Sequence, residues 1–171
     1  MIRIVIAEDQ EMLLGAMGSL LNLEEDMEVV GQASNGEEAL ALVHQLLPDV
    51  CIMDIEMPEM SGLEAAEALS SFGCKVIILT TFPRSGYFER VLQADVSGYL
   101  LKDNPSEELA GSIRRIIDGE RIYSSELIDE DSIDCEADLE VFQAQGKRPT
   151  KVNTVRNYLT TILDKMKLPT G

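Results

Sequence analysis

The sequence is poor in basic residues. It contains 14 Lys and Arg against 31 Asp and Glu, so its formal net charge is -17 at pH 7. Proteins that bind nucleic acid or anionic membranes in a general way rely on Lys and Arg to neutralise phosphates. The charge therefore argues against such binding for the chain as a whole.

Cysteine is also scarce. The three cysteines, Cys51, Cys74 and Cys135, are far apart, and no two of them have C-x-x-C spacing. This pattern argues against a disulfide framework or a zinc site and favours reduced thiols. The sequence also shows no signal peptide and no apolar segment of membrane length. We therefore expect a cytoplasmic location.

Residues 1–118 contain short β-branched runs that alternate with longer amphipathic segments. The predicted strands are Ile2–Ile6, Val29–Gly31, Val50–Met53, Val76–Leu79 and Gly98–Leu101. Runs that are apolar on both faces, such as residues 76–79, are typical of parallel strands covered by helices on both sides. The pattern predicts a doubly wound (βα)5 fold of the α/β class, with the flavodoxin-like strand order 2-1-3-4-5.

Polar residues stand at the ends of four of these strands. Glu8 and Asp9 follow the first strand, Asp54 the third, Thr80 the fourth and Lys102 the fifth. In a parallel sheet these ends share one edge, where ligands bind. Clustered carboxylates repel one another unless a cation lies among them, and Mg²⁺ uses a few carboxylates together with water and phosphate oxygens. The set therefore predicts a phosphoryl-transfer site, in which one acid accepts phosphorus and the hydroxyl and ammonium meet the phosphate oxygens.

Each of these residues also has an ordinary structural interpretation. Asp54 would begin a turn, and Glu8 and Asp9 would complement a helix dipole. Thr80 would be an edge β-former and Lys102 a surface lysine. The coincidence of suitable groups at four strand ends favours the functional interpretation.

The charge changes sign toward the C-terminus. Residues 119–146 contain 1 basic and 9 acidic residues, whereas residues 147–171 contain 6 basic and 1 acidic. We predict an α/β domain over residues 1–120, an acidic linker over 121–148 and a basic amphipathic helix over 149–171.

Four stretches, IAEDQ, PDVCIMDIEMPEMSGLE, VIILTTF and GYLLKD, resemble the receiver domain of two-component response regulators of the NarL/FixJ class, which has a LuxR-type output module. The resemblance implies that Asp54 is the phosphoacceptor and that Glu8, Asp9, Asp54 and the backbone carbonyl of Glu56 hold Mg²⁺. Within the class, the sequence is most similar to those of regulators of membrane lipid fluidity. One departure is Asp95, where the family usually has Ala-Gly before the fifth strand.

The resemblance further implies that Thr80 and Tyr99 are a switch pair and that Lys102 contacts the phosphoryl group. From the residues alone, core packing is the simpler interpretation of Tyr99. The implied partners are a cognate histidine kinase and, after phosphorylation, a second copy of the chain. The predicted dimer forms through the first and last helices, because they carry more apolar residues than one buried stripe needs. These residues are Met12, Leu13, Leu14, Met17, Leu20, Leu21, Leu109, Ile113, Ile116 and Ile117.

The segment KVNTVRNYLTTILDKMKL resembles the recognition helix of a helix-turn-helix module. The resemblance implies promoter DNA as a partner, contacted by Lys151, Asn153, Thr154, Arg156 and Asn157. The helices that should precede this segment are not recognisable in EADLEVFQAQGKRPT, so we expect a shortened or altered output region.

Two other functions remain open from the sequence. One is a stand-alone receiver that acts through protein–protein interaction without binding DNA. The other is a phosphohydrolase with an aspartate nucleophile, in which Asp54 and Glu56 would form the acid pair. A receiver has no substrate cap and turns over only its own phosphoryl group, so we expect a protein that is not an enzyme.

Overall fold

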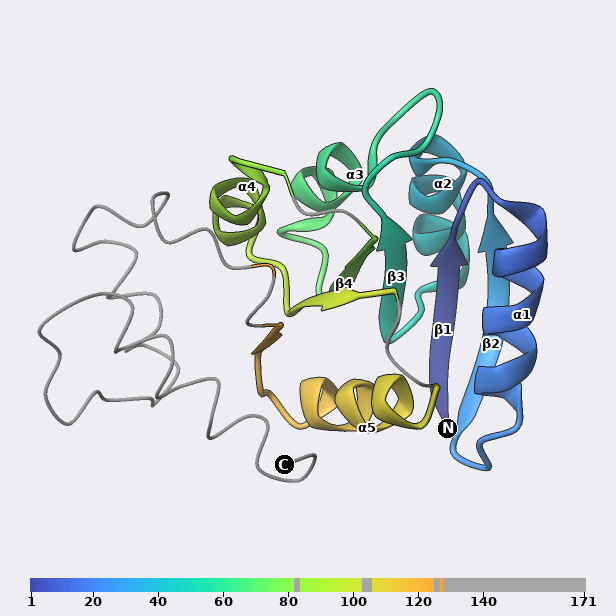
Figure 1. Cartoon of the computed structure of the whole chain (residues 1–171). Helices are drawn as coiled ribbons and strands as arrows, with labels where there is room; N and C mark the ends of the chain where they lie inside the picture. Colours follow the sequence, from blue (N-terminus) through green and yellow to red (C-terminus); the bar gives the residue numbers. More distant parts are fainter. Residues whose placement is uncertain (82–83, 103–105, 125–126, 128–171) are drawn as a thin grey trace, which may run out of the picture.

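The fold is described by a computed structural model, which defines residues 1–81, 84–102, 106–124 and 127 (Figure 1). Strands and helices alternate along the chain. In order, the elements are β1 (Ile2–Ala7), α1 (Glu11–Asn22), β2 (Met27–Ala33), α2 (Gly36–Leu46), β3 (Val50–Asp54), α3 (Gly62–Leu69), β4 (Lys75–Thr80), α4 (Tyr87–Gln93), β5 (Gly98–Leu101), α5 (Ser106–Ile117) and β6 (Ile122–Tyr123).

The strands form one parallel sheet in the order β2-β1-β3-β4-β5-β6. The predicted flavodoxin-like fold and the order of the first five strands are therefore confirmed. Helices α1 and α5 cover one face of the sheet, and α2, α3 and α4 cover the other (Figure 1). This arrangement brings the carboxyl ends of β1, β3, β4 and β5 to the same edge.

Strand β3 shows why its sequence is apolar throughout. Val50 and Ile52 lie in the core beneath α1 and α5, whereas Cys51 and Met53 lie in the core beneath the other helices. Side chains alternate between the faces of a strand, so a strand with helices on both sides needs apolar residues at every position.

The sixth strand was not expected. β6 contains only two residues, which is too short for a periodic pattern to reveal. Tyr123 is nevertheless buried, and the N–H of Ser124 donates a hydrogen bond to the carbonyl of Tyr99 at 2.8 Å. The boundary at residue 120 remains a prediction, but the first residues beyond it belong to the sheet.

The apolar residues of α1 and α5 differ in burial, and Leu13, Leu14 and Met17 are partly buried. Leu21, Leu109, Ile113 and Ile116 are buried in the core, so they form the stripe that packs against the sheet. The exposed members of this face are Met12, Leu20, Leu23 and Ile117. Packing against the sheet therefore uses most of the apolar stripe on α5.

The predicted linker beyond residue 127 and the predicted helix over 149–171 lie outside the described residues, as do Lys151, Asn153, Thr154, Arg156 and Asn157. Within the described part of the chain, no helix has the length and apolar character needed to cross a membrane.

Candidate functional site

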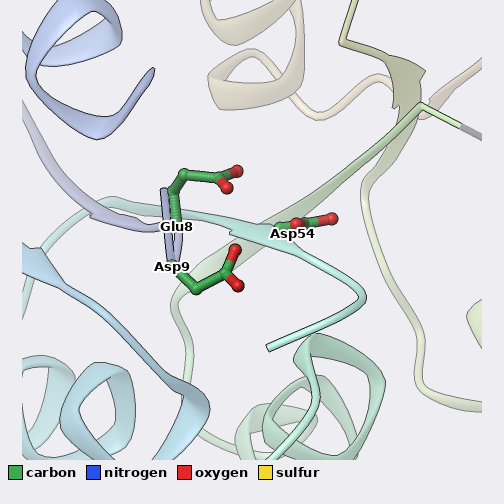
Figure 2. Close-up of side chains that lie close together, drawn as sticks. All are labelled: Glu8, Asp9 and Asp54. Atoms are coloured by element: carbon green, nitrogen blue, oxygen red, sulfur yellow. The ribbon is translucent and has the colours of Figure 1, made fainter. Parts of the chain in front are cut away.

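Three carboxylates meet at the carboxyl edge of the sheet. Glu8 and Asp9 directly follow β1, and Asp54 is the last residue of β3. One ligand oxygen from each residue lies within 4.8 Å of the others, and Figure 2 shows the three side chains grouped around one space. Glu8 and Asp54 are buried, whereas Asp9 is exposed. The sequence analysis predicted this cluster from the strand ends.

Lys102 joins two of these carboxylates from the end of β5. Its Nζ lies 2.6 Å from Oε2 of Glu8 and 2.9 Å from Oδ2 of Asp54. Burial alone would lower the pKa of Lys102, but its hydrogen bonds to Glu8 and Asp54 raise it above the ordinary value. The lysine is therefore a fixed positive charge inside the site, and its assignment as a surface residue is excluded.

Glu8 is the least solvated of the three acids. Burial raises the pKa of its carboxyl group, and the negative charge of Asp54 raises it further, while hydrogen bonds from Lys102 and the Gln10 N–H act in the opposite direction. One ammonium faces three carboxylates, so the cluster retains an excess of negative charge. Such a donor set of carboxylate oxygens fits a hard divalent cation such as Mg²⁺.

A cavity of about 240 Å³ opens beside the cluster. Thr80, which is buried at the end of β4, lines this cavity together with Asp54 and Lys102. Glu56 also contributes to the wall. Asp9 lines the cavity as well, and Glu8 contacts Lys102 beside it, so the structure brings the predicted residues of the strand ends together.

Tyr99 lies elsewhere. Its side chain is fully buried, and its ring stacks on Phe88 of α4 with centroids 6.4 Å apart. Tyr99 is not among the residues that line the cavity. The structure places it in the core, as the simpler interpretation held, and its role as a switch remains a prediction.

Gly62 is a site residue that the sequence analysis missed. A Cβ atom at this position would lie 2.0 Å from the carbonyl oxygen of Asp54, so the first turn of α3 approaches β3 more closely than any side chain allows. The Gly62 N–H donates to the carbonyl of Ile55 at 2.9 Å. The glycine was visible in the sequence, but the close approach depends on how α3 packs.

Two further residues contact the rim of the cavity through Glu56. Nη2 of Arg84 lies 2.6 Å from Oε1 of Glu56, and the hydroxyl of Tyr87 donates to the same oxygen at 3.3 Å. Both come from the segment between β4 and α4 or the first turn of α4. No sequence pattern signals these contacts, because they join residues about 30 positions apart.

The fold and this acidic edge are those of a receiver domain. The chain belongs to the response regulator family, because the family model for the response regulator receiver domain matches residues 4–114.

Relatives of the whole chain are named as transcriptional regulators. The chain is 53% identical over 182 residues to the transcriptional regulatory protein DesR of Bacillus subtilis, an alignment that covers 98% of this chain and 92% of the relative. It is 52% identical to the uncharacterized transcriptional regulatory protein YvfU of the same organism, with coverage of 97% and 91%. The DesR alignment is longer than this chain of 171 residues, so the relative has residues within the aligned span that this chain lacks.

Solved structures resemble the receiver part. A DNA-binding response regulator of the LuxR family from Staphylococcus aureus is 42% identical, with a TM-score of 0.66 over 68% of this chain and 99% of that chain. The signal receiver domain of the putative response regulator NarL from Mycobacterium tuberculosis is 29% identical, also with a TM-score of 0.66, over 70% of this chain and 98% of that chain. These likenesses agree with the NarL class expected from the sequence.

Proposed function

We propose that this protein acts in the cytoplasm, that Asp54 accepts a phosphoryl group from a phosphohistidine of a cognate histidine kinase, and that this event controls transcription. The observation that carries the proposal is the position of Lys102. Its ammonium lies 2.9 Å from Oδ2 of Asp54 in a buried site that contains two more carboxylates. A buried cation held against one acid of an acidic cluster is the arrangement that phosphoryl transfer to a carboxylate requires.

In the transfer step, a carboxylate oxygen of Asp54 attacks phosphorus. The new P–O bond forms as the P–N bond to the kinase histidine breaks, and the electron pair of that bond returns to the imidazole nitrogen. Lys102 and Thr80, which carry an ammonium and a hydroxyl group, line the cavity in which the phosphoryl oxygens would lie. Both groups therefore stabilise negative charge on those oxygens.

Glu8, Asp9, Asp54 and the backbone carbonyl of Glu56 are the groups that would hold Mg²⁺. When bound, the cation neutralises charge on the transferring phosphoryl group and on the acids around it. The buried Glu8 and the exposed Asp9 differ in their contacts. Glu8 also fixes Lys102, whereas Asp9 stands at the open side of the cluster.

The proposed output is a phosphorylation-favoured homodimer through α1 and α5. This face exposes Leu20 and Leu23 and contains an apolar cavity of about 130 Å³ lined in part by Leu13 and Met17. Exposed apolar surface of this kind suits a self-complementary contact between two copies. Transcription control is supported by the relatives named as transcriptional regulators, which align with almost the whole chain.

Native mass spectrometry with Mg²⁺ and acetyl phosphate tests the phosphorylation step. The parent is expected to gain one phosphoryl group and Asp54→Ala none. Asp118→Ala is a matched control, because Asp118 is exposed and lies after α5. Phosphorylation of Asp54→Ala to the level of the parent would contradict the proposal.

The dimer has its own test. Leu20→Glu is expected to keep phosphorylation and to lose the phosphorylation-dependent dimer in the same spectra. Leu47→Glu adds the same charge at an exposed leucine after α2 and should dimerise like the parent. An unchanged dimer in Leu20→Glu would remove α1 from the interface. A change at Ile113 could not test this surface, because Ile113 is in the core.

A further inference from the structure

The segment after α5 is hydrogen-bonded to β5 and to the turn that precedes it. The N–H of Ile122 donates to the carbonyl of Ser97 at 3.0 Å, and the N–H of Ser124 donates to the carbonyl of Tyr99 at 2.8 Å. We call residues 121–124 the connector, because they follow the last receiver helix and lead toward the C-terminal part of the chain. Main-chain hydrogen bonds thus make the connector a continuation of the sheet.

Side chains add a second attachment at the same turn. The carbonyl of Val96 accepts hydrogen bonds from Nη1 of Arg121 at 3.2 Å and from the hydroxyl of Tyr123 at 3.1 Å. The other terminal nitrogen of Arg121 donates to the carboxylate of Asp95. We call the Asp95–Arg121 ion pair the clasp. It ties the start of the connector to the end of α4.

Asp95 occupies a position that usually favours glycine. Its N–H donates to the carbonyl of Leu92 and the N–H of Val96 donates to that of Val91, which closes the C-terminus of α4 in a Schellman arrangement. The backbone of Asp95 is accordingly left-handed, with φ of 57°. Aspartate adopts this conformation less readily than glycine. The carboxylate at this position therefore has a use beyond ending the helix, and the clasp is the contact that it makes.

The clasp belongs to the same packed unit as Tyr99. Phe88 of α4 stacks on Tyr99, and its ring also meets the ring of Tyr123 edge-on with centroids 5.8 Å apart. Tyr99 and Tyr123 lie opposite each other on β5 and β6. Asp95 follows α4, and Arg121 precedes β6, which pairs with β5. A displacement of α4 relative to β5 therefore changes the distance between the two residues of the clasp.

We propose that the clasp is a relay that couples phosphorylation of Asp54 to the connector. The inference rests on the proposed function. The clasp is closed in the structure described here. Lys102 follows β5 directly and contacts Asp54, so a phosphoryl group on Asp54 displaces Lys102 and β5 and thereby opens the clasp. The side chain of Asp95 is 57% exposed and that of Arg121 is 20% exposed. Ion pairs near the surface contribute little to stability, so opening this one costs little free energy.

Hydrogen–deuterium exchange of the full chain tests the relay, with Mg²⁺ and with or without acetyl phosphate. The phosphoryl count is read from the intact mass of the same samples. Asp95→Asn removes the charge but keeps a residue that tolerates the left-handed backbone. Asp95→Gly removes the carboxylate and favours that backbone, so it separates loss of the clasp from loss of folding. Glu67→Gln is the control, because it removes a comparable half-exposed ion pair between α3 and Arg90.

In the parent, phosphorylation is expected to speed exchange at the amides of Ile122 and Ser124 by about threefold or more. In Asp95→Asn and Asp95→Gly these amides exchange faster before phosphorylation, and phosphorylation adds little. Glu67→Gln behaves like the parent.

A response to phosphorylation that is equal in the parent and both Asp95 variants would overturn the relay. So would a phosphorylated parent whose connector exchanges at an unchanged rate. A parent that gains no phosphoryl group would overturn the proposed function and the relay with it, and the intact mass distinguishes this outcome from the others.

Discussion

Two clusters in this protein each place one cation between two carboxylates. The buried cluster consists of Lys102, Glu8 and Asp54, and the surface cluster consists of Arg114, Glu24 and Asp26. The side chains of the buried cluster are 1–11% exposed, whereas those of the surface cluster are 32–47% exposed. The distances are similar, so the two clusters differ chiefly in their contact with water.

Because of this difference, the pKa of an acid is shifted in opposite directions in the two clusters. Burial raises the pKa of Glu8 even though Lys102 is in contact with it. The hydrogen bond from Arg114 lowers the pKa of Asp26, which is at the surface. Charge pairing alone is therefore ordinary, whereas an excess of charge held away from water is costly and marks a functional site.

The largest effect is expected from Lys102→Met. It would leave Glu8 and Asp54 buried without their cation, and such a loss costs about 3 kcal/mol of unfolding free energy. Arg114→Met should cost less than about 1 kcal/mol, because its partners remain hydrated. Urea unfolding followed by far-UV circular dichroism measures both, since the chain has no tryptophan for fluorescence. Equal losses in the two variants would remove the distinction between the clusters.

A smaller effect is expected from a change in the close contact between the backbones of α3 and β3 at the buried cluster. Gly62→Ala would place a Cβ atom 2.0 Å from the Asp54 carbonyl oxygen, and the forced shift is expected to cost about 2 kcal/mol and to slow phosphorylation. Gly15→Ala is the control. Nothing lies within 4 Å of the added atom in the middle of α1, so this change should stabilise the protein by up to about 1 kcal/mol. If both variants phosphorylate at the rate of the parent, the close approach of α3 is not needed by the site.

The smallest effect concerns the surface cluster and pH. The pKa of Asp26 is lower in the folded protein than in the unfolded chain, so its contribution is present at neutral pH and is lost as the pH falls below about 4. Asp26→Asn should shift the urea midpoint slightly at pH 7, and the shift should shrink as the pH falls below about 4. A high salt concentration should also reduce the shift at pH 7. A difference that does not decrease as the pH falls would show that Asp26 acts through packing rather than charge.

The site was predictable where it depends on strand ends. Asp54 and Lys102 each terminate an apolar run, and parallel strands bring their carboxyl ends to one edge whatever the details of packing. The burial of Lys102 was not predictable in the same way. A lysine after a strand can reach solvent or turn inward, and the choice is made by Glu8 and Asp54, which are far away in the sequence.

Tyr99 and β6 show what local sequence pattern does not predict. The pattern placed Tyr99 on a strand face, but its stacking on Phe88 depends on where α4 lies. β6 has two residues and exists because β5 offers it an open edge. The Asp95–Arg121 ion pair likewise joins residues 26 positions apart, and only its unusual Asp95 was visible beforehand.

Local sequence pattern was sufficient to predict the class of fold, the order of the first five strands and the residues at the acidic edge. These follow from local periodicity and from a topology that parallel strands with helical crossovers share. By contrast, the burial of charges, the exposure of apolar residues on α1 and α5 and the hydrogen bonding of the connector became visible only in the folded structure. Those properties depend on distances between segments that are remote in the chain, and packing sets such distances while local pattern does not.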